Sequence, residues 1–375
     1  AAQVAGSETS TIIVTPNVAG GGACAGADIS FTITVRPGGG VDSVADRVAC
    51  AGQLVEVNFT GPGNPGFVWS NNNPAIGLPA SGTGNISFNA ANVTAVETAT
   101  ITVAPDIASG FAYIPNNVSN TVSVIDLSTN TVVATIPVGF APFGVSVSPD
   151  GSRVYVTNRE ATGGTVSVID AATNTVIATI PVGQNPTGIA VSPDGSLALV
   201  ANTASGTISL LETFTNTVLA TIPTPGIIPT GVTFHPDGFR AYISGSNRVL
   251  VLDVIVGTIT ATIPVGGGPY GLRVSPDGTK IYVACANSDN LYVLDAATNA
   301  VLAVVPVGDA PSGVVISPDG SRVYIANEND ATISVLDAGT NTVVATIPIS
   351  GLLSGPIGIS ITPDGQFVYA ANILA

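Results

Sequence analysis

The sequence predicts an all-β protein in which a β-propeller follows a smaller β-sandwich. The main observation is a phrase that returns about every 43 residues from residue 111 onward: YVxN, SVID, a TN turn, ATIPVG and PxGxxxSPDG. A period of roughly 40–50 residues that holds four short strands is typical of propeller blades. The apolar residues within each unit alternate and are mostly β-branched, as in pleated, packed strands. Gly, Pro, Asp and Asn separate the strands and mark tight turns.

Each repeat unit is expected to form four strands, A to D in chain order. Strand A follows a Pro-x-Gly turn, strand B resembles RVYVTN, strand C resembles TVSVID, and strand D resembles TVIATIPVG. Because proline lacks the N–H that a neighbouring strand would bind, a proline-bearing strand belongs at a sheet edge. Strand D is therefore predicted to be the outer strand of each blade. Its prolines are Pro137, Pro181, Pro223, Pro264, Pro306 and Pro348.

The strand count does not close a regular ring. Strand B occurs seven times, whereas strands A, C and D each occur six times, in the order BCD, five ABCD units and AB. We favour a seven-bladed propeller with an incomplete last blade. In the alternative, a six-bladed ring, the last strand A completes the first blade. An unfinished blade would expose a sheet edge, and such edges recruit further strands.

The first 105 residues have a different character. Residues 37–105 contain strand-like stretches between Gly/Asn/Pro-rich turns and predict a small β-sandwich with Trp69 as its core anchor. Residues 1–36 hold two clear strands, too few for an independent fold. They are interpreted as a partial β module or a strand-donating segment, and residues 106–375 as the propeller.

The composition restricts the classes of function. Charged residues make up 9% of the chain, against about 25% in ordinary soluble domains. The net charge of −15 argues against binding to nucleic acid or anionic membranes. No run of 18 apolar residues predicts a membrane span. A single lysine and the absence of methionine suit a long-lived extracellular or cell-surface protein, and the start AAQVAGSE lacks the pattern of a signal peptide, which is taken as already removed.

The three cysteines have two expected roles. Cys24 and Cys50 lie in the similar settings GACAG and VACAG, and we expect a disulfide between them, which implies an oxidising compartment. Cys285, in the strand IYVACAN, is expected to be a small buried apolar residue.

Catalytic patterns are not found. The single histidine, His235, stands in FHPDG where other repeats read SPDG, so it is interpreted as a turn substitution. The sequence has no G-x-S-x-G, no zinc-ligand spacing and no phosphate-binding glycine loop, and we expect no enzyme, no catalytic residue and no cofactor.

Two binding candidates remain. Arg273 is the one charged residue at the inward position of a strand A, and it is a candidate contact for an anionic ligand in the central channel. Asp289, Glu328 and Asp330 are clustered in two adjacent B–C loops and are weak candidates for Ca²⁺ ligands, without the spacing of an established calcium loop.

The repeat closely resembles the YVTN-type β-propellers of archaeal and bacterial cell-surface proteins. The matching stretches include RVYVTN (153–158), TVSVIDAATNTVIATIPVG (165–183) and PTGIAVSPDG (186–195). The stretch WSNNNPAIGLPASGTGNISF (69–88) is similar to PKD-like immunoglobulin-type modules of the Bacteroidota. The resemblance implies an extracellular surface-layer-like protein, and the YVTN-type family brings no common catalytic residues.

Together these observations favour a non-enzymatic structural protein, the subunit of a surface layer or filament. Self-association into a homopolymer, with strands donated between subunits, would complete both ends of the chain. A fragment of a longer protein would have the same incomplete ends. The alternative function is an adhesin or a module that binds glycans or other surface proteins through the loop face of the propeller. A propeller enzyme is the third hypothesis.

Overall fold

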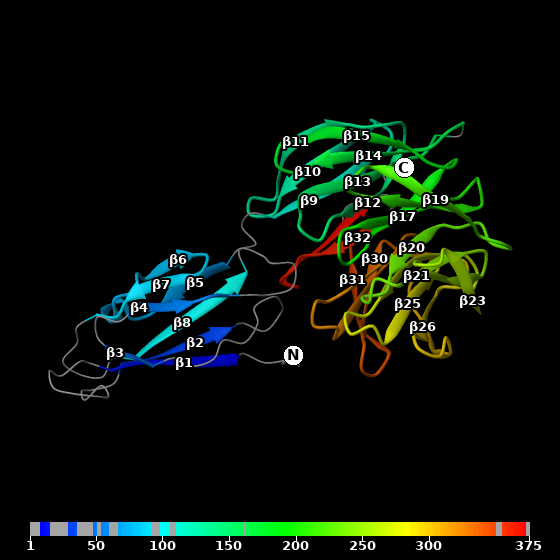
Figure 1. Ribbon diagram of the computed structural model, residues 1–375. Coiled ribbons are helices and arrows are strands. Elements are labelled where there is room, and N and C mark those ends of the chain that lie inside the picture. Colours follow the sequence, from blue (N-terminus) through cyan, green and yellow to red (C-terminus); the bar gives the residue numbers. More distant parts are fainter. Residues whose placement is uncertain are drawn as a thin grey trace. The chain divides into compact units, whose positions relative to one another are not determined.

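The described residues form β-strands, one short 3₁₀ helix and loops (Figure 1). The computed structural model describes residues 8–15, 29–35, 48–50, 54–59, 67–91, 98–105, 110–160, 162–349 and 355–372. The chain divides into two compact units, residues 1–110 with 362–366 and residues 111–361 with 367–375. In the described part of the chain, no helix has the length and apolar character that crossing a bilayer requires.

The first unit contains a six-stranded sheet and a two-stranded sheet. The larger sheet has the order β3-β1-β2-β8-β5-β6, and the smaller one pairs β4 with β7. The strand bounds are β1 Glu8–Thr15, β2 Ile29–Val35, β3 Val48–Cys50, β4 Leu54–Val57, β5 Phe67–Asn71, β6 Ser81–Thr83, β7 Ile86–Asn89 and β8 Thr98–Pro105, with the 3₁₀ helix η1 at Pro74–Ile76.

The two sheets share one apolar core that includes Trp69. Its members come from β4, β5, η1, β7 and β8 and include Val57, Ile76 and Ile101, all with no exposed surface. Trp69 is 8% exposed, which confirms it as a core residue. The indole also explains Gly82, since a Cβ there would lie 2.2 Å from the Trp69 ring.

The strands within residues 1–36 have partners in this same sheet. β1 and β2 pair antiparallel with each other, β1 pairs parallel with β3, and β2 pairs parallel with β8. In this chain they are therefore not a separate module without partners. The expected Cys24–Cys50 disulfide lies outside the described residues, because Cys24 and the Cys50 side chain are not among them.

The second unit is a β-propeller whose blades follow the predicted order (Figure 1). Blade 1 has three strands, blades 2 to 6 have four each, and a two-stranded sheet, blade 7, follows. The A strands, absent from blade 1, are β12 Pro142–Val147, β16 Pro186–Val191, β20 Gly231–Phe234, β24 Pro269–Val274, β28 Pro311–Ile316 and β32 Pro356–Ile361. The B strands of blades 1 to 7 are β9 Phe111–Asn116, β13 Arg153–Asn158, β17 Leu197–Asn202, β21 Arg240–Gly245, β25 Lys280–Cys285, β29 Arg322–Asn327 and β33 Val368–Asn372.

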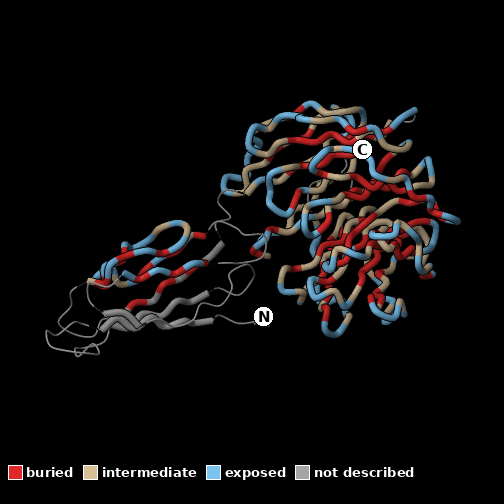
Figure 2. Tube along the Cα trace, in the orientation of Figure 1, coloured by how far each residue is buried: buried red, intermediate tan, exposed pale blue. Residues whose placement is uncertain are grey.

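Strands C and D complete blades 1 to 6. The C strands are β10 Thr121–Asp126, β14 Thr165–Asp170, β18 Thr207–Glu212, β22 Arg248–Asp253, β26 Asn290–Asp295 and β30 Thr332–Asp337. The D strands are β11 Thr131–Pro137, β15 Thr175–Pro181, β19 Thr217–Pro223, β23 Thr258–Pro264, β27 Val301–Pro306 and β31 Thr342–Pro348. Each D strand is the edge of its sheet, as the prolines predict. Figure 2 shows the corresponding exposed residues along the rim and the buried B and C strands inside it.

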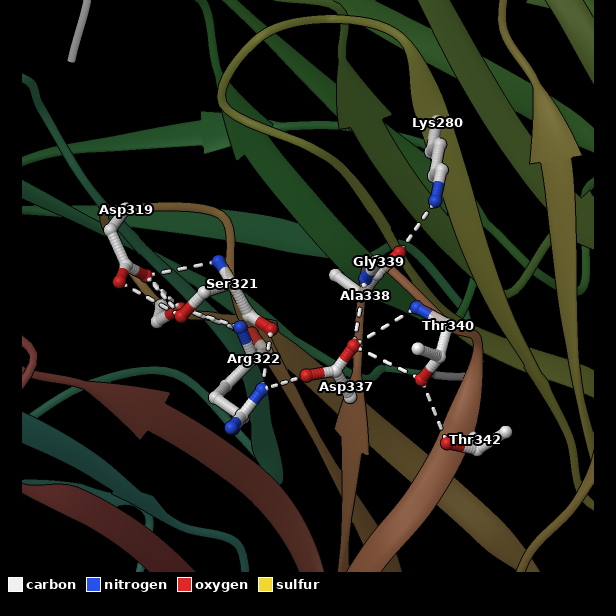
Figure 3. Close-up of polar contacts among 10 residues, drawn as sticks. Lys280, Asp319, Ser321, Arg322, Asp337, Ala338, Gly339, Thr340 and Thr342 are labelled. Carbon is white, nitrogen blue, oxygen red and sulfur yellow. Dashed lines mark hydrogen bonds and ion pairs between the residues drawn. The ribbon is translucent and has the colours of Figure 1, made fainter. Parts of the chain in front are cut away.

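Aspartates fix most of the tight turns of the repeat. In blade 6, Asp319 accepts hydrogen bonds from the backbone N–H and hydroxyl of Ser321 in the A–B turn. In the C–D turn, Asp337 accepts from the N–H groups of Gly339 and Thr340 and pairs with Arg322 (Figure 3). These side chains therefore replace the backbone partners that a turn lacks, the usual role of Asp in such loops.

A buried contact explains two further residues of the repeat, the Asn that ends strand B and the Gly of ATIPVG. The Asn that ends strand B is fully buried in blades 2, 3 and 6, and its amide nitrogen donates to hydroxyls of strand C, as Asn158 does to Thr165 and Ser167. The Gly of ATIPVG packs against this amide: a Cβ on Gly139 would lie 2.6 Å from the Asn158 side chain. The Asn of one unit thus requires the Gly of the preceding unit.

Blade 7 occupies its own position in the ring. Neighbouring blades are joined by B-strand side chains that reach the C–D turn of the next blade, as Lys280 Nζ donates to Ala338 O over 2.6 Å. Tyr369 of β33 makes the corresponding contact with blade 1, where its hydroxyl donates to Asn130 Oδ1 over 2.8 Å. β32 pairs with β33, and not with β9 as the six-bladed alternative requires. The propeller therefore has six blades of three or four strands and a two-stranded seventh.

Candidate functional site

The open seventh blade is the first candidate site. Between β33 and β9, a regular ring would hold strands C and D of blade 7 and strand A of blade 1, three consecutive strands of the repeat. β33 and β9 therefore each have one edge without a strand partner among the described residues. Such edges present unpaired N–H and C=O groups to any extended segment that reaches them.

Apolar side chains that other blades bury are exposed at this opening. Ile347, on β31 of blade 6, is 46% exposed. Its equivalents on the other D strands are between 3% and 7% exposed, namely Ile136, Ile180, Ile222, Ile263 and Val305. The blade that follows blade 6 differs from the others, because it has no strands C and D among the described residues. Ile347 thus marks the surface that these two strands would cover.

Both walls of the opening share this feature. On blade 6, Tyr324 is partly exposed, whereas Tyr155 and Tyr282 at the same position are 1% exposed. On the facing side of blade 1, Ile114 and Ile125 are partly exposed, although their counterparts in complete blades have no exposed surface. The opening is therefore an apolar surface with an unpaired strand edge.

Alanine substitutions at equivalent positions are expected to separate buried from exposed isoleucines. Ile180→Ala removes a buried side chain and should lower the free energy of unfolding by about 3 kcal/mol. Ile347→Ala should lower it by less than about 1 kcal/mol, because much of the side chain already contacts water. Denaturant unfolding of the two variants measures the difference. Equal losses would mean that another part of the protein covers Ile347.

Several aromatic and charged residues meet at the end of the ring where the A strands begin. Phe143 of β12 and Tyr270 of β24, from blades 2 and 5, form an edge-to-face pair with ring centroids 6.3 Å apart. The Arg159 guanidinium lies 4.4 Å above the Phe143 ring, and its Nε donates to Asn185 Oδ1 over 2.9 Å. Burial raises the pKa of Tyr270 to about 12, with nearby Arg159 opposing and Glu328 reinforcing this shift. These contacts cross the central channel of the ring and narrow the channel at this end.

Arg273 lies on the same innermost strand as Tyr270, three residues further along. Its side chain is accessible to solvent, yet desolvation by the surrounding protein lowers the guanidinium pKa. Arginine stays protonated in proteins, so Arg273 places a positive charge on an innermost strand. Its Nη1 donates to the carbonyl of the adjacent Leu272 over 3.1 Å. None of the ion pairs among the described residues includes it.

The calcium candidates take part in loop structure. Asp289 Oδ1 accepts from the Ala310 N–H over 3.0 Å, as Asn120 does from Ala141 in blade 1. Asp330 Oδ2 accepts from the Asp309 N–H over 2.7 Å. Glu328 lies close enough to Tyr270 to influence its pKa.

No group of three His, Cys, Asp or Glu side chains suited to a metal is present among the described residues. The geometry therefore gives Asp289 and Asp330 a structural role and adds no support for Ca²⁺.

His235 and Cys285 occupy structural positions. His235 is buried in its turn: Nε2 lies 2.9 Å from the Gly278 carbonyl, and Nδ1 accepts from the Asp237 N–H. Cys285 has no exposed surface, and burial raises its thiol pKa to about 12. It stands where other blades carry the buried Asn. Both interpretations made from the sequence are confirmed.

Two protein-family models match parts of the propeller. The cytochrome D1 heme domain matches residues 113–230, and the family described as lactonase, 7-bladed beta-propeller, matches residues 269–374. They match different blades, and neither covers half of the chain. They support a β-propeller; they do not show the YVTN-type or PKD-like families.

Solved structures agree with this assignment of the fold. Kuenenia stuttgartiensis hydrazine synthase is similar with a TM-score of 0.63 and 26% identity, over 71% of this chain and 90% of that one. Similarity extends to 1647 chains, so structural likeness alone selects no function. A search of curated proteins found no significant match.

All three named matches refer to enzymes or enzyme domains, and they do not support the firm exclusion of enzymatic activity made from the sequence. The described residues around the axis do not fit a heme or a metal, however. Haem iron is held by His, Cys, Met or Tyr. The single histidine is buried and hydrogen-bonded in an A–B turn, Cys285 is buried in a blade, and the raised pKa of Tyr270 disfavours the phenolate.

Proposed function

We propose that this protein is an extracellular structural subunit that assembles into a layer or filament through its open seventh blade. The observation that carries the proposal is the exposure of Ile347, 46% against 3–7% at five equivalent positions. In the following blade, β33 has an edge without a strand partner among the described residues. A surface of this kind is covered when an extended segment adds to the sheet.

The proposed occupant is a second copy of this chain, which donates the β1–β2 hairpin. In every complete blade, strands C and D form an antiparallel hairpin with six or seven residues per strand. β1 and β2 also form an antiparallel hairpin, with eight and seven residues. The β2 sequence ISFTITV alternates apolar and polar residues as strand C does. Length, pairing and sequence pattern therefore match.

The exchange of partners is energetically reasonable. Within one chain, β1 and β2 are joined to the rest of their sheet through parallel pairs with β3 and β8. In blade 7 the hairpin would pair antiparallel with β33, and antiparallel pairs are slightly more stable per residue. The hairpin would also cover Ile347 and Tyr324. Burial of apolar surface supplies about 25 cal/mol per Å².

A head-to-tail contact of this kind repeats from copy to copy. Because the donating and accepting surfaces differ, the contact is heterologous and generates an open chain unless its rotation closes a ring. The low charge fraction of 9% and the single lysine support an extracellular setting, where few cleavage sites for trypsin-like proteases favour a long lifetime.

Two lysine substitutions on the same strand test the proposal. Ile347→Lys places a charge where the donated strands must pack and is expected to leave only monomers. Val344→Lys is the matched control: Val344 is 53% exposed, and its equivalents Ile177 and Leu302 are also exposed in complete blades. It should assemble like the unmodified protein. Light scattering and electron microscopy of the intact, native protein distinguish the two.

Four results would contradict this proposal. Assembly of Ile347→Lys at the normal concentration would exclude the open blade as the contact. Loss of assembly in both variants would indicate a general effect of charge on the rim. Monodisperse particles of the unmodified protein would exclude assembly. A native polypeptide that continues beyond residue 375 and closes its own blade would replace the second copy as the occupant.

A further inference from the structure

The cations of the propeller are those that begin the B strands, two that lie toward the axis, and Arg248 at the start of β22. Those that begin the B strands serve the fold: Arg240 Nη1 donates to the Ala296 carbonyl of the next blade, Lys280 donates to Ala338, and Arg322 pairs with Asp337. Arg159 and Arg273 have no such role and lie toward the axis. In a chain with 9 cations and a net charge of −15, two axial arginines need a separate explanation.

Arg273 is the less satisfied of the two. Arg159 donates to Asn185 and stacks over Phe143. The described contacts of the Arg273 guanidinium include only one acceptor, the neighbouring carbonyl of Leu272. A guanidinium carries five N–H donors in a planar fork that fits two oxygens of one anion. Most of its donors are therefore available to a ligand.

The surroundings of Arg273 favour an anion. The same position of the other A strands holds Ser146, Ala190, Thr233, Val315 and Ser360, small or uncharged residues that leave no carboxylate at this level of the ring. Ser360 is exposed and Ser146 partly exposed, next to the place where blade 1 lacks strand A. Their hydroxyls supply further hydrogen-bond donors.

We propose that Arg273 forms a binding site for a small oxyanion at the axis of the propeller, such as a sulfate, phosphate or carboxylate group. The ligand is small, because the Phe143–Tyr270 pair narrows the axis at the end where the A strands begin. Entry is from the A–B turn side or through the position of the absent strand A in blade 1. The site is independent of assembly at the outer part of blade 7.

Titration calorimetry of the intact protein with sodium sulfate, inorganic phosphate and acetate tests the site at low ionic strength. At least one of these anions is expected to bind with a Kd of about 1 mM or tighter. Arg273→Gln should weaken that binding at least tenfold, and Arg273→Lys should restore part of it. Arg248→Gln removes an equal charge from an exposed arginine at the start of β22 and serves as the control with unchanged affinity.

The outcomes separate a site from general electrostatics. Equal affinity in Arg273→Gln and the unmodified protein would overturn the proposal. Equal losses in Arg273→Gln and Arg248→Gln would show a nonspecific effect of net charge and overturn it as well. The absence of binding by all three anions up to tens of millimolar would have the same consequence. Circular dichroism of each variant confirms that a lost signal does not come from unfolding.

Discussion

Gly271→Ala is expected to destabilise the propeller by about 3 kcal/mol or more, the upper range for an overpacked core. Gly271 lies on β24, where adjacent A strands pack closely around the axis. A Cβ at this position would lie 2.2 Å from the Ser312 carbonyl oxygen and 3.2 Å from the Gly313 Cα, both backbone atoms of the next blade. Since a backbone cannot move aside as a flexible side chain does, the two innermost strands must separate. Denaturant unfolding of the purified variant measures the loss.

Gly358→Ala is the matched control for this substitution. Gly358 holds the equivalent position on β32, but the next blade has no strand A, and a Cβ would meet only the Ala371 side chain at 3.6 Å. The variant should match the unmodified protein or gain up to about 1 kcal/mol, because alanine reduces the freedom of the unfolded chain. A loss of stability as large as that of Gly271→Ala would show that another segment occupies the position of strand A in blade 1.

Acidification is expected to unfold the protein through its turn aspartates. Hydrogen bonds lower the pKa of nine of them; the largest cause is the Ser148 hydroxyl for Asp150, the Ser192 hydroxyl for Asp194 and the Thr173 hydroxyl for Asp170. The others are Asp126, Asp237, Asp277, Asp295, Asp319 and Asp337. Each group contributes little because most are exposed, but the repeat multiplies the effect.

The direction of the pH effect follows from these lowered values. The unfolded chain titrates its aspartates near pH 3.9, and the folded chain titrates them at lower pH. Between these values the unfolded state holds more protons, so the free energy of unfolding decreases as the pH falls below about 4. The stability that these aspartates contribute is fully present above about pH 4. The melting temperature, measured from pH 7 to 2.5, should therefore be level at first and then decrease steeply. A constant or rising melting temperature below pH 4 would contradict this expectation.

Much of the propeller fold was predictable because the residues of each repeat by themselves indicate its strands, turns and edge. Proline in strand D defines the edge, since its missing N–H excludes a further partner. Aspartate and glycine define the A–B turn, and Asn174 and Asn341 of the TN turns adopt the positive φ that such a hairpin requires. The outer position of strand D, the buried state of Trp69 and Cys285, and the place of His235 in a turn follow from such local patterns.

The candidate sites were less predictable. The calcium hypothesis grouped Asp289, Glu328 and Asp330 by their place in adjacent loops, but two of these carboxylates accept hydrogen bonds from backbone amides that only the folded loops bring near. The sequence singled out Arg273 as the charged residue of an innermost strand. It did not reveal the Phe143–Tyr270 pair, because these residues are 127 positions apart and meet only across the ring.

The sequence alone determined the number, order and edge of the propeller strands, since these depend on neighbouring residues and on a repeat that recurs regardless of its position. Only the tertiary structure decided how the ends of the repeat array are accommodated. β32 pairs with β33 and leaves β9 without a strand A, and Ile347 is exposed although its local sequence, TVVATIP, is that of β11, where Ile136 is buried. Burial depends on which atoms pack against a residue. Ile347 faces blade 7, in which no strand C or D is present among the described residues.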